Sequence, residues 1–205
     1  IRKRPEIIYT LDDYVAEGIM SEEQAARLKQ ATESKENILI AGGTGSGKTT
    51  LTNALLNEPA FRKDRVVLIE DTPELQCAAD DCVELFTKRT EPQVSMAQLV
   101  ATTLRLRPDR IIIGEVRDGS ALDMLKAWNT GHPGGIATLH ANSAEDALAR
   151  VEDLVGEVSQ AIPYRSSGSA INIVAYIRRA PEGRKLDSLV KVNGYADGKY
   201  QLEIL

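Results

Sequence analysis

A phosphate-binding pattern stands near the start of the chain. Residues 42–49 read GGTGSGKT, which fits G-x-x-x-x-G-K-[ST], and Thr50 follows directly. The glycines of this pattern let backbone N–H groups surround a chain of phosphates, while its lysine reaches the outer phosphates and its hydroxyl group binds Mg²⁺. We therefore predict a site for a nucleoside triphosphate, formed by Gly43, Thr44, Gly45, Ser46, Gly47, Lys48, Thr49 and Thr50.

The segments around this loop have the arrangement that phosphate binding needs. Residues 37–41 (NILIA) form an apolar run typical of a buried strand, and residues 48–56 (KTTLTNALL) are typical of a helix. The N-terminus of that helix would face the phosphates, where its backbone dipole favours negative charge. This order argues against the alternative, a glycine-rich turn that contains Lys-Thr by chance.

Polar side chains follow three further apolar runs. Glu70 and Asp71 come after RVVLI, Glu115 stands just past the end of RIIIG, and His140 follows GIATL. In open parallel sheets, ligands bind beyond the carboxyl ends of the strands. We therefore expect these side chains and the phosphate loop to meet at one edge of a sheet.

Glu115 is the predicted carboxylate that activates the attacking water. Phosphoryl transfer depends mostly on positioning and charge stabilisation, and a carboxylate after a strand can orient water or hold Mg²⁺ through water. Thr49 would bind Mg²⁺ directly, with waters of the ion held by Glu70, Asp71 or Glu115. The alternative for Glu115 is a solvated acid that follows a strand by chance.

Transfer of a γ-phosphate also needs positive charge, and Arg117 is the first candidate because it stands beside Glu115. His140 follows a strand close to the phosphate site and can sense the γ-phosphate, although a lone histidine is often structural. Each remaining candidate arginine is more often a surface residue than a catalytic one; these are Arg89, Arg105 and Arg107.

Apolar strands and amphipathic helices alternate four times along the chain, which predicts an α/β fold with a mostly parallel sheet and helices on both faces. Thr10 and Ser21 begin capping-box sequences, so two short helices should precede the first strand. A third capping box at Ser95 predicts a helix with Leu104 on its apolar face, ended by Pro108.

Two regions are expected to depart from that alternation. Residues 72–92 contain proline, acids and both cysteines, and they predict an irregular segment with a brief strand over residues 83–87. Residues 170–177 read as a strand, and the alternating runs 186–192 and 199–205 predict antiparallel strands at the edge of the sheet.

The composition is that of an ordinary globular domain of 205 residues, with 42% hydrophobic and 27% charged residues. The net charge of -5 does not favour direct binding to nucleic acid or to an anionic membrane. No apolar run approaches the roughly 18 residues of a membrane span, and the start IRKRPE lacks a signal peptide, which predicts a cytosolic protein. Cys77 and Cys82 are predicted to be ordinary thiols, with a zinc site or a disulfide as the alternatives.

Four segments together resemble one family of motor proteins. AGGTGSGKTTLTNALLNE, LIEDTPELQ, TTLRLRPDRIIIGEVRD and AWNTGHPGGIATLHANSAEDALARVEDL are similar to the Walker A motif, Asp box, Walker B motif and His box of hexameric secretion ATPases. The chain resembles in particular the TrbB-type conjugal transfer ATPases of type IV secretion systems. The likeness extends from Tyr9 to about Val158.

The resemblance implies a RecA-like P-loop NTPase domain over residues 11–205, with ATP and Mg²⁺ as its ligands. Residues 1–10 would be a linker from an N-terminal domain outside this sequence, which suits a chain that opens on Ile1. A homo-hexamer with ATP between neighbours is implied, in the cytoplasm and peripheral to an inner-membrane secretion channel. Carried over by position, the catalytic set is Lys48, Glu70, Glu115, Arg117 and His140, with Glu74 also in the Asp box.

The sequence thus predicts the MgATP-hydrolysing motor domain of a conjugative or type IV secretion ATPase. A pilus-retraction or type II secretion ATPase is an alternative, although type II motors usually carry a four-cysteine metal element and this chain has two cysteines. A second alternative is an ATP-binding assembly switch with negligible turnover. A third, a P-loop kinase, needs an acceptor site that the sequence does not reveal.

Overall fold

A computed structural model describes residues 8–205 of the chain. Its α-helices are α1 (Leu11–Ala16), α2 (Glu22–Glu33), α3 (Lys48–Leu56), α4 (Met96–Thr103), α5 (Ser120–Asn129), α6 (Ala144–Gly156) and α7 (Tyr164–Ala170). Two 3₁₀ turns are η1 (Pro59–Phe61) and η2 (Leu104–Leu106). The strands are β1 (Ile38–Ala41), β2 (Arg65–Glu70), β3 (Asp81–Phe86), β4 (Arg110–Val116), β5 (Ile136–Leu139), β6 (Ile173–Ala180), β7 (Gly183–Ala196) and β8 (Lys199–Ile204).

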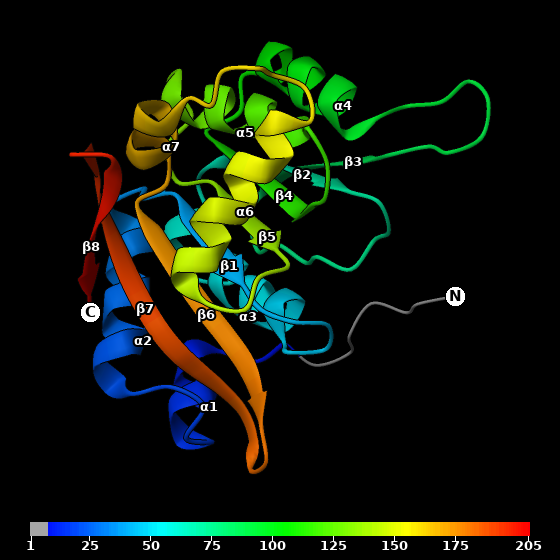
Figure 1. Ribbon diagram of the computed structural model, residues 1–205. Coiled ribbons are helices and arrows are strands. Elements are labelled where there is room, and N and C mark those ends of the chain that lie inside the picture. Colours follow the sequence, from blue (N-terminus) through cyan, green and yellow to red (C-terminus); the bar gives the residue numbers. More distant parts are fainter. Residues whose placement is uncertain (1–7) are drawn as a thin grey trace.

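All eight strands form one sheet in the order β3-β2-β4-β5-β1-β6-β7-β8 (Figure 1). The strands from β3 to β6 run parallel, and β7 and β8 add antiparallel pairing at one edge. The predicted α/β fold with antiparallel strands at the C-terminal edge is confirmed. Of the predicted linker, residues 1–7 lie outside the described part of the chain.

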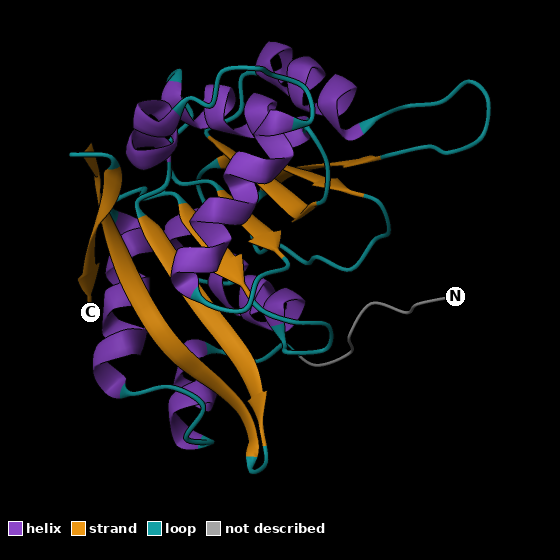
Figure 2. Cartoon of the chain, in the orientation of Figure 1, coloured by secondary structure: helices purple, strands orange, loops and turns teal. Residues whose placement is uncertain are grey.

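Helices cover both faces of the sheet, as Figure 2 shows. Hydrophobic residues of α4, α5, α6 and α7 pack on one face with Leu39 of β1, whereas those of α1, α2 and α3 pack on the other with Ile38 and Ile40. Successive side chains of a strand point to opposite faces, so a strand covered on both sides needs an unbroken apolar run. This double burial explains the ILIA sequence that holds the phosphate loop in place.

Local signals set the starts of four helices. Thr10, Ser21 and Ser95 each accept a hydrogen bond from the backbone N–H three residues later, and the residue at that position returns a side-chain bond. Ser143 accepts from the backbone N–H of Asp146 at the start of α6. The predicted caps are therefore confirmed, and α3 has the predicted bounds.

Two strands differ from the prediction. β3 is a six-residue strand parallel to β2, longer than the brief strand expected within an irregular segment. β4 continues to Val116, so Glu115 lies within the strand and not just past its end. The pairing of β4 with β5 shifts between Ile113 and Val116, and such a bulge changes the direction of the side chains at its centre. Cys77 and Cys82, on either side of the start of β3, form no disulfide.

One helix and one further strand were also wrong in part. α4 ends at Thr103, before the expected stop at Pro108, and Leu104 is 42% exposed instead of buried. The expected strand over residues 170–177 begins only at Ile173, because the residues before it form α7. Glycine permits that helix: a Cβ at Gly168 would lie 2.9 Å from the backbone carbon of Gly194 in β7.

The sheet end opposite the phosphate loop is anchored by a buried arginine. Arg110 is 1% exposed, and its Nε donates to Asp64 Oδ2 at 2.6 Å. Its guanidinium lies 4.2 Å from the centre of the Phe61 ring. These contacts explain how a charged residue can occupy the first position of the apolar strand β4. Among the described residues, no helix has the length and apolar character needed to span a membrane.

Candidate functional site

The carboxyl edge of the parallel strands carries a pocket of about 740 Å³. The strand ends predicted to converge do meet here, since the phosphate loop, the end of β2, Glu115 of β4 and His140 after β5 all line it. The residues that line it include Thr44, Gly45, Ser46, Gly47, Lys48, Thr49, Thr50, Glu70, Asp71, Thr72, Glu74, Arg89, Glu115, Arg117, Thr138, His140 and Arg184.

The phosphate loop has the backbone that its glycines allow. Gly45 has φ +71° and Gly47 has φ +106°, and the latter caps α3 without any side-chain hydrogen bond. The free N–H groups of the first turn of α3 therefore remain open toward the pocket. Lys48 is 8% exposed, and its Nζ donates to the carbonyl oxygens of Gly42 at 2.8 Å and Gly43 at 3.0 Å.

Ser46 supplies an independent sign that the loop is built for a polar ligand. Its side chain is 2% exposed, and within the described chain its hydroxyl oxygen has no hydrogen-bond partner. Leaving a buried hydroxyl unpaired costs about 1–3 kcal/mol, so such groups usually meet a ligand or water. With Lys48 and the open N–H groups, this hydroxyl fits a nucleotide's phosphates.

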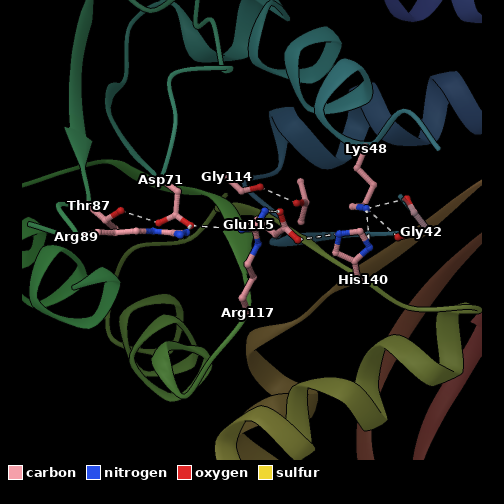
Figure 3. Close-up of polar contacts among 11 residues, drawn as sticks. Gly42, Lys48, Asp71, Thr87, Arg89, Gly114, Glu115, Arg117 and His140 are labelled. Atoms are coloured by element: carbon pink, nitrogen blue, oxygen red, sulfur yellow. Dashed lines mark hydrogen bonds and ion pairs between the residues drawn. The ribbon is translucent and has the colours of Figure 1, made fainter. Parts of the chain in front are cut away.

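Glu115 lies between an arginine and a histidine, as Figure 3 shows. Its Oε2 accepts a short hydrogen bond from Arg117 Nη2, and its Oε1 lies 2.9 Å from His140 Nε2. On the other side of the ring, His140 Nδ1 lies 3.4 Å from Lys48 Nζ. The carboxylate predicted to activate water is thus connected to the phosphate-loop lysine through a single imidazole.

The charges around His140 determine its protonation. Partial burial and then the nearby Lys48 ammonium lower the pKa of His140, outweighing the opposing effect of Glu115. In a neutral ring with the proton on Nε2, Nδ1 can accept from Lys48 Nζ while Nε2–H faces the Glu115 carboxylate. Burial also lowers the pKa of Lys48.

Asp71 is the second carboxylate held by Arg117. Thr87 Oγ1 donates to Asp71 Oδ1 at 2.7 Å, while Arg117 Nη1 and Arg89 Nη2 lie 3.6 and 3.7 Å from Oδ2. The side chain of Arg89 is 82% exposed, so its ion pair is weak. Arg117 therefore bridges Asp71, which follows β2, and Glu115, which lies in β4.

Glu70 has a different environment from the other acids. It is 3% exposed, and its Oε1 accepts hydrogen bonds from the backbone N–H groups of Glu74 and Leu75, both at 3.0 Å. Its carboxylate thereby fixes the loop after β2 against the pocket. Thr138 of β5 donates to the Gly114 carbonyl at 2.6 Å and so ties β5 to β4 beside Glu115.

The pocket offers few direct metal ligands. No group of three or more His, Cys, Asp or Glu side chains in residues 8–205 is arranged to hold a metal ion. Thr49 lines the pocket with Glu70, Asp71 and Glu115. Mg²⁺ is often held by few protein oxygens together with substrate phosphates and waters, and this donor set fits that mode of binding.

The structure separates the arginines that the sequence could not distinguish. Arg117 and Arg89 line the pocket, whereas Arg105 and Arg107 are exposed and do not line it. Sequence reasoning missed Arg184, which enters from the β6–β7 hairpin. Its position after Gly183 at a hairpin turn gave no local signal of a ligand site.

Comparison with known proteins places these motifs in a family context. Residues 1–178 match the family described as type II/IV secretion system protein. A relative from Sinorhizobium fredii, described as probable conjugal transfer protein TrbB, is 50% identical over 99% of this chain and 62% of the relative. The chain thus spans about three fifths of that relative's length.

Solved structures share the fold. The VirB11 ATPase from the Brucella suis type IV secretion system superposes with a TM-score of 0.74 and 30% identity, over 93% of this chain and 65% of that one. The pilus retraction motor PilT, solved with bound ADP, gives a TM-score of 0.68 and 24% identity, over 99% of this chain and 55% of that one. The likeness to PilT supports the fold alone.

Proposed function

Because this chain belongs to the type II/IV secretion system protein family, we propose that it is the MgATP-hydrolysing motor domain of a conjugative type IV secretion ATPase. The observation that carries the proposal is the position of Glu115. Its carboxylate lies 2.9 Å from His140 Nε2, and the other nitrogen of that ring lies 3.4 Å from Lys48 Nζ. An acid able to activate water thus stands beside the phosphate-loop lysine.

The chain's own residues account for the steps of hydrolysis. Lys48 and the N–H groups at the start of α3 bind the β- and γ-phosphates, and Glu115 orients a water for in-line attack and accepts its proton. The bond between the γ-phosphorus and the β–γ bridging oxygen breaks, and ADP leaves with the bridging oxygen. Lys48 and Arg117 stabilise the charge that develops on the γ-phosphate. Mg²⁺, bound through Thr49, would neutralise charge on the phosphates.

We place this domain in a larger assembly. It would form a homo-hexamer with ATP between neighbours, in the cytoplasm and peripheral to an inner-membrane secretion channel, as the resemblance of its motifs to hexameric secretion ATPases implies. The relatives described as a conjugal transfer protein and as the ATPase of a type IV secretion system support the secretion context. The pocket is open to solvent at Arg89 and Arg184, where a neighbouring subunit could complete it. The negative net charge argues against direct nucleic-acid binding by this domain.

A second candidate function is an ATP-binding assembly switch with negligible turnover. The observation that favours it is that each oxygen of Glu115 has a basic neighbour, since Arg117 Nη2 donates a hydrogen bond to Oε2 and His140 Nε2 lies 2.9 Å from Oε1. Arg117 and His140 therefore compete with water for this carboxylate. Measuring ATP turnover as a function of protein concentration separates the two functions: a steep rise indicates catalysis in a ring, and a flat rate near zero indicates a switch.

Two substitutions test the motor function. Lys48→Ala removes the ammonium that the phosphates need, so we expect loss of both ATP binding and ATP turnover. Glu115→Gln keeps the shape of the side chain but cannot accept a proton, so turnover should fall at least about 100-fold while ATP binding persists. Phosphate release measures turnover, and calorimetry measures binding.

Glu145→Gln is the matched control for Glu115→Gln, because Glu145 is an exposed acid on α6 that does not line the pocket. Its turnover should equal that of the wild-type chain. Robust hydrolysis by Glu115→Gln would overturn the role of Glu115 in activating water. Unchanged ATP binding by Lys48→Ala would overturn the assignment of the phosphate loop as the ATP site.

A further inference from the structure

The phosphate loop is contacted from the β6–β7 hairpin as well as from the acids of β4. A Cβ at Gly42 would lie 2.2 Å from the Ile177 carbonyl oxygen in β6. A Cβ at Gly47 would lie 2.7 Å from Arg184 Cδ and 3.1 Å from Arg184 Nε. The side chain of Arg184 therefore rests directly on the loop backbone where α3 begins.

Arg184 is a cation without a described acidic partner. Within residues 8–205 it forms no ion pair, whereas Arg117, Arg89 and Arg178 each have a carboxylate nearby. Its cross-strand partner in the hairpin is Arg179, a second cation. Like charges opposite one another destabilise a strand pair, so this hairpin end has an unbalanced positive charge that suits an anion.

The strand order indicates which part of a nucleotide lies near Arg184. Glu115 and His140 belong to β4 and the end of β5, on one side of β1, while Arg184 belongs to β7 on the other side. A nucleotide with its γ-phosphate near Glu115 directs its opposite end across the loop toward β6 and β7. Gly47, at the N-terminus of α3, lies between these two sides.

We propose that Arg184 binds the α-phosphate of the nucleotide, from the side of the phosphate loop opposite to Glu115. This inference rests on the proposed function, because it assumes that ATP and ADP occupy the pocket. A guanidinium can form two parallel hydrogen bonds to phosphate oxygens, which a lysine cannot reproduce. Since ATP and ADP share an α-phosphate, Arg184 contributes equally to the binding of both.

Calorimetric titration of the 205-residue chain with MgADP, and with the imido analogue of ATP, tests this role. Arg184→Met keeps the apolar stem on Gly47 and removes the charge, so the Kd for both ligands should rise by the same factor, about tenfold. Arg184→Lys should give a smaller rise, about threefold, since it keeps the charge and loses the fork.

Arg179→Met is the matched control, because it removes the same charge from the opposite strand of the hairpin at a residue that does not line the pocket. Its Kd values should stay within about twofold of wild type. A thermal melt shows whether Arg184→Met folds. If it does not fold, Arg184→Lys takes its place in the titrations. Kd values of Arg184→Lys equal to those of the wild-type chain would then overturn the inference.

Three results would count against Arg184 as the α-phosphate ligand. Unchanged Kd values for Arg184→Met overturn this inference alone, provided that the wild-type chain binds both ligands. A rise for the ATP analogue without a rise for ADP places Arg184 at the γ-phosphate and also overturns it. A wild-type chain that binds neither ligand overturns the proposed function together with this inference.

Discussion

The two sides of strand β1 present different charge arrangements to the phosphate loop. On the β4 and β5 side, Glu115, Arg117, His140 and Asp71 pair with one another, so each charge or proton donor has a partner. On the β6 and β7 side, Arg184 stands without an acidic partner in the described chain. The β4 and β5 side, called the acidic side below, is therefore a network of paired groups. The β6 and β7 side, called the hairpin side, presents one cation that has no acidic partner among the described residues.

This difference suggests a division of labour. Arg117 and His140 compete with water for Glu115, so the state of this network can depend on what occupies the site. An unpaired arginine can accept an anion without breaking any ion pair. We therefore propose that the β4 and β5 side carries out catalysis and its control, and that the hairpin retains the nucleotide.

The largest expected effect that separates the two sides comes from Arg117→Met. It removes the cation that holds both Glu115 and Asp71, so kcat should fall by about 10² to 10³ while the Kd for ADP changes less than about threefold. Arg184→Met should instead raise the Kd for ADP by about tenfold. Steady-state phosphate release and ADP titration measure the two quantities.

Arg62→Met controls for the loss of one positive charge, since Arg62 is exposed and lies outside the pocket. The kcat of Arg62→Met and its Kd for ADP should both match those of the wild-type chain. If Arg117→Met weakened ADP binding as much as Arg184→Met does, the division between the two sides would be wrong.

A smaller effect should distinguish two glycines of the loop. Gly45→Ala should lower the free energy of unfolding by roughly 1 kcal/mol, the cost of a positive φ alone, because no atom lies within 4 Å of the added Cβ. Gly47→Ala has a similar conformational cost, and its Cβ also collides with Arg184 Cδ. This collision should lower the free energy of unfolding by a further amount of about 1–2 kcal/mol. Urea unfolding of each variant measures the difference.

The same pair of substitutions in an Arg184→Ala background completes the comparison. Removing the arginine stem should bring the cost of Gly47→Ala close to that of Gly45→Ala. A difference that persisted without Arg184 would mean that the Arg184 side chain does not cause the added cost at Gly47.

The smallest expected effect is a pH dependence on the acidic side. Because burial and Lys48 lower the pKa of His140 in the folded chain, the unfolded chain binds more protons as the pH falls below about 6.5. His140 therefore contributes stability above that pH, and the contribution is lost as the pH falls through the lowered folded-state pKa. The groups that face His140 are Lys48, Glu115 and Arg117.

Urea midpoints at pH 7.5 and pH 5.5, for the wild-type chain and for His140→Asn, measure this effect. The wild-type midpoint should fall more on acidification than that of the variant, because asparagine cannot take up the proton. An equal fall in both chains would remove His140 as the cause.

Much of the fold could be read from local sequence. Thr10, Ser21 and Ser95 form the caps that their spacing indicated, because a capping box involves residues only three positions apart. α7 escaped prediction because its sequence, YRSSGSA, has weak helix propensity, and packing of Gly168 against β7 supports it. Leu104 was misplaced because its helix tightens into a 3₁₀ turn, which changes the face that each side chain occupies.

The sequence by itself determined the phosphate loop and the acids at the strand ends, because each depends on a short run of residues and the local geometry that the run adopts. Only the tertiary structure decided that His140 joins Lys48 to Glu115, and that Arg184 rests on Gly47 from the other side. Those contacts join residues 25 to 137 positions apart, and the order of strands in the sheet brings them together. Strand order follows from packing of the whole core, which no local pattern records.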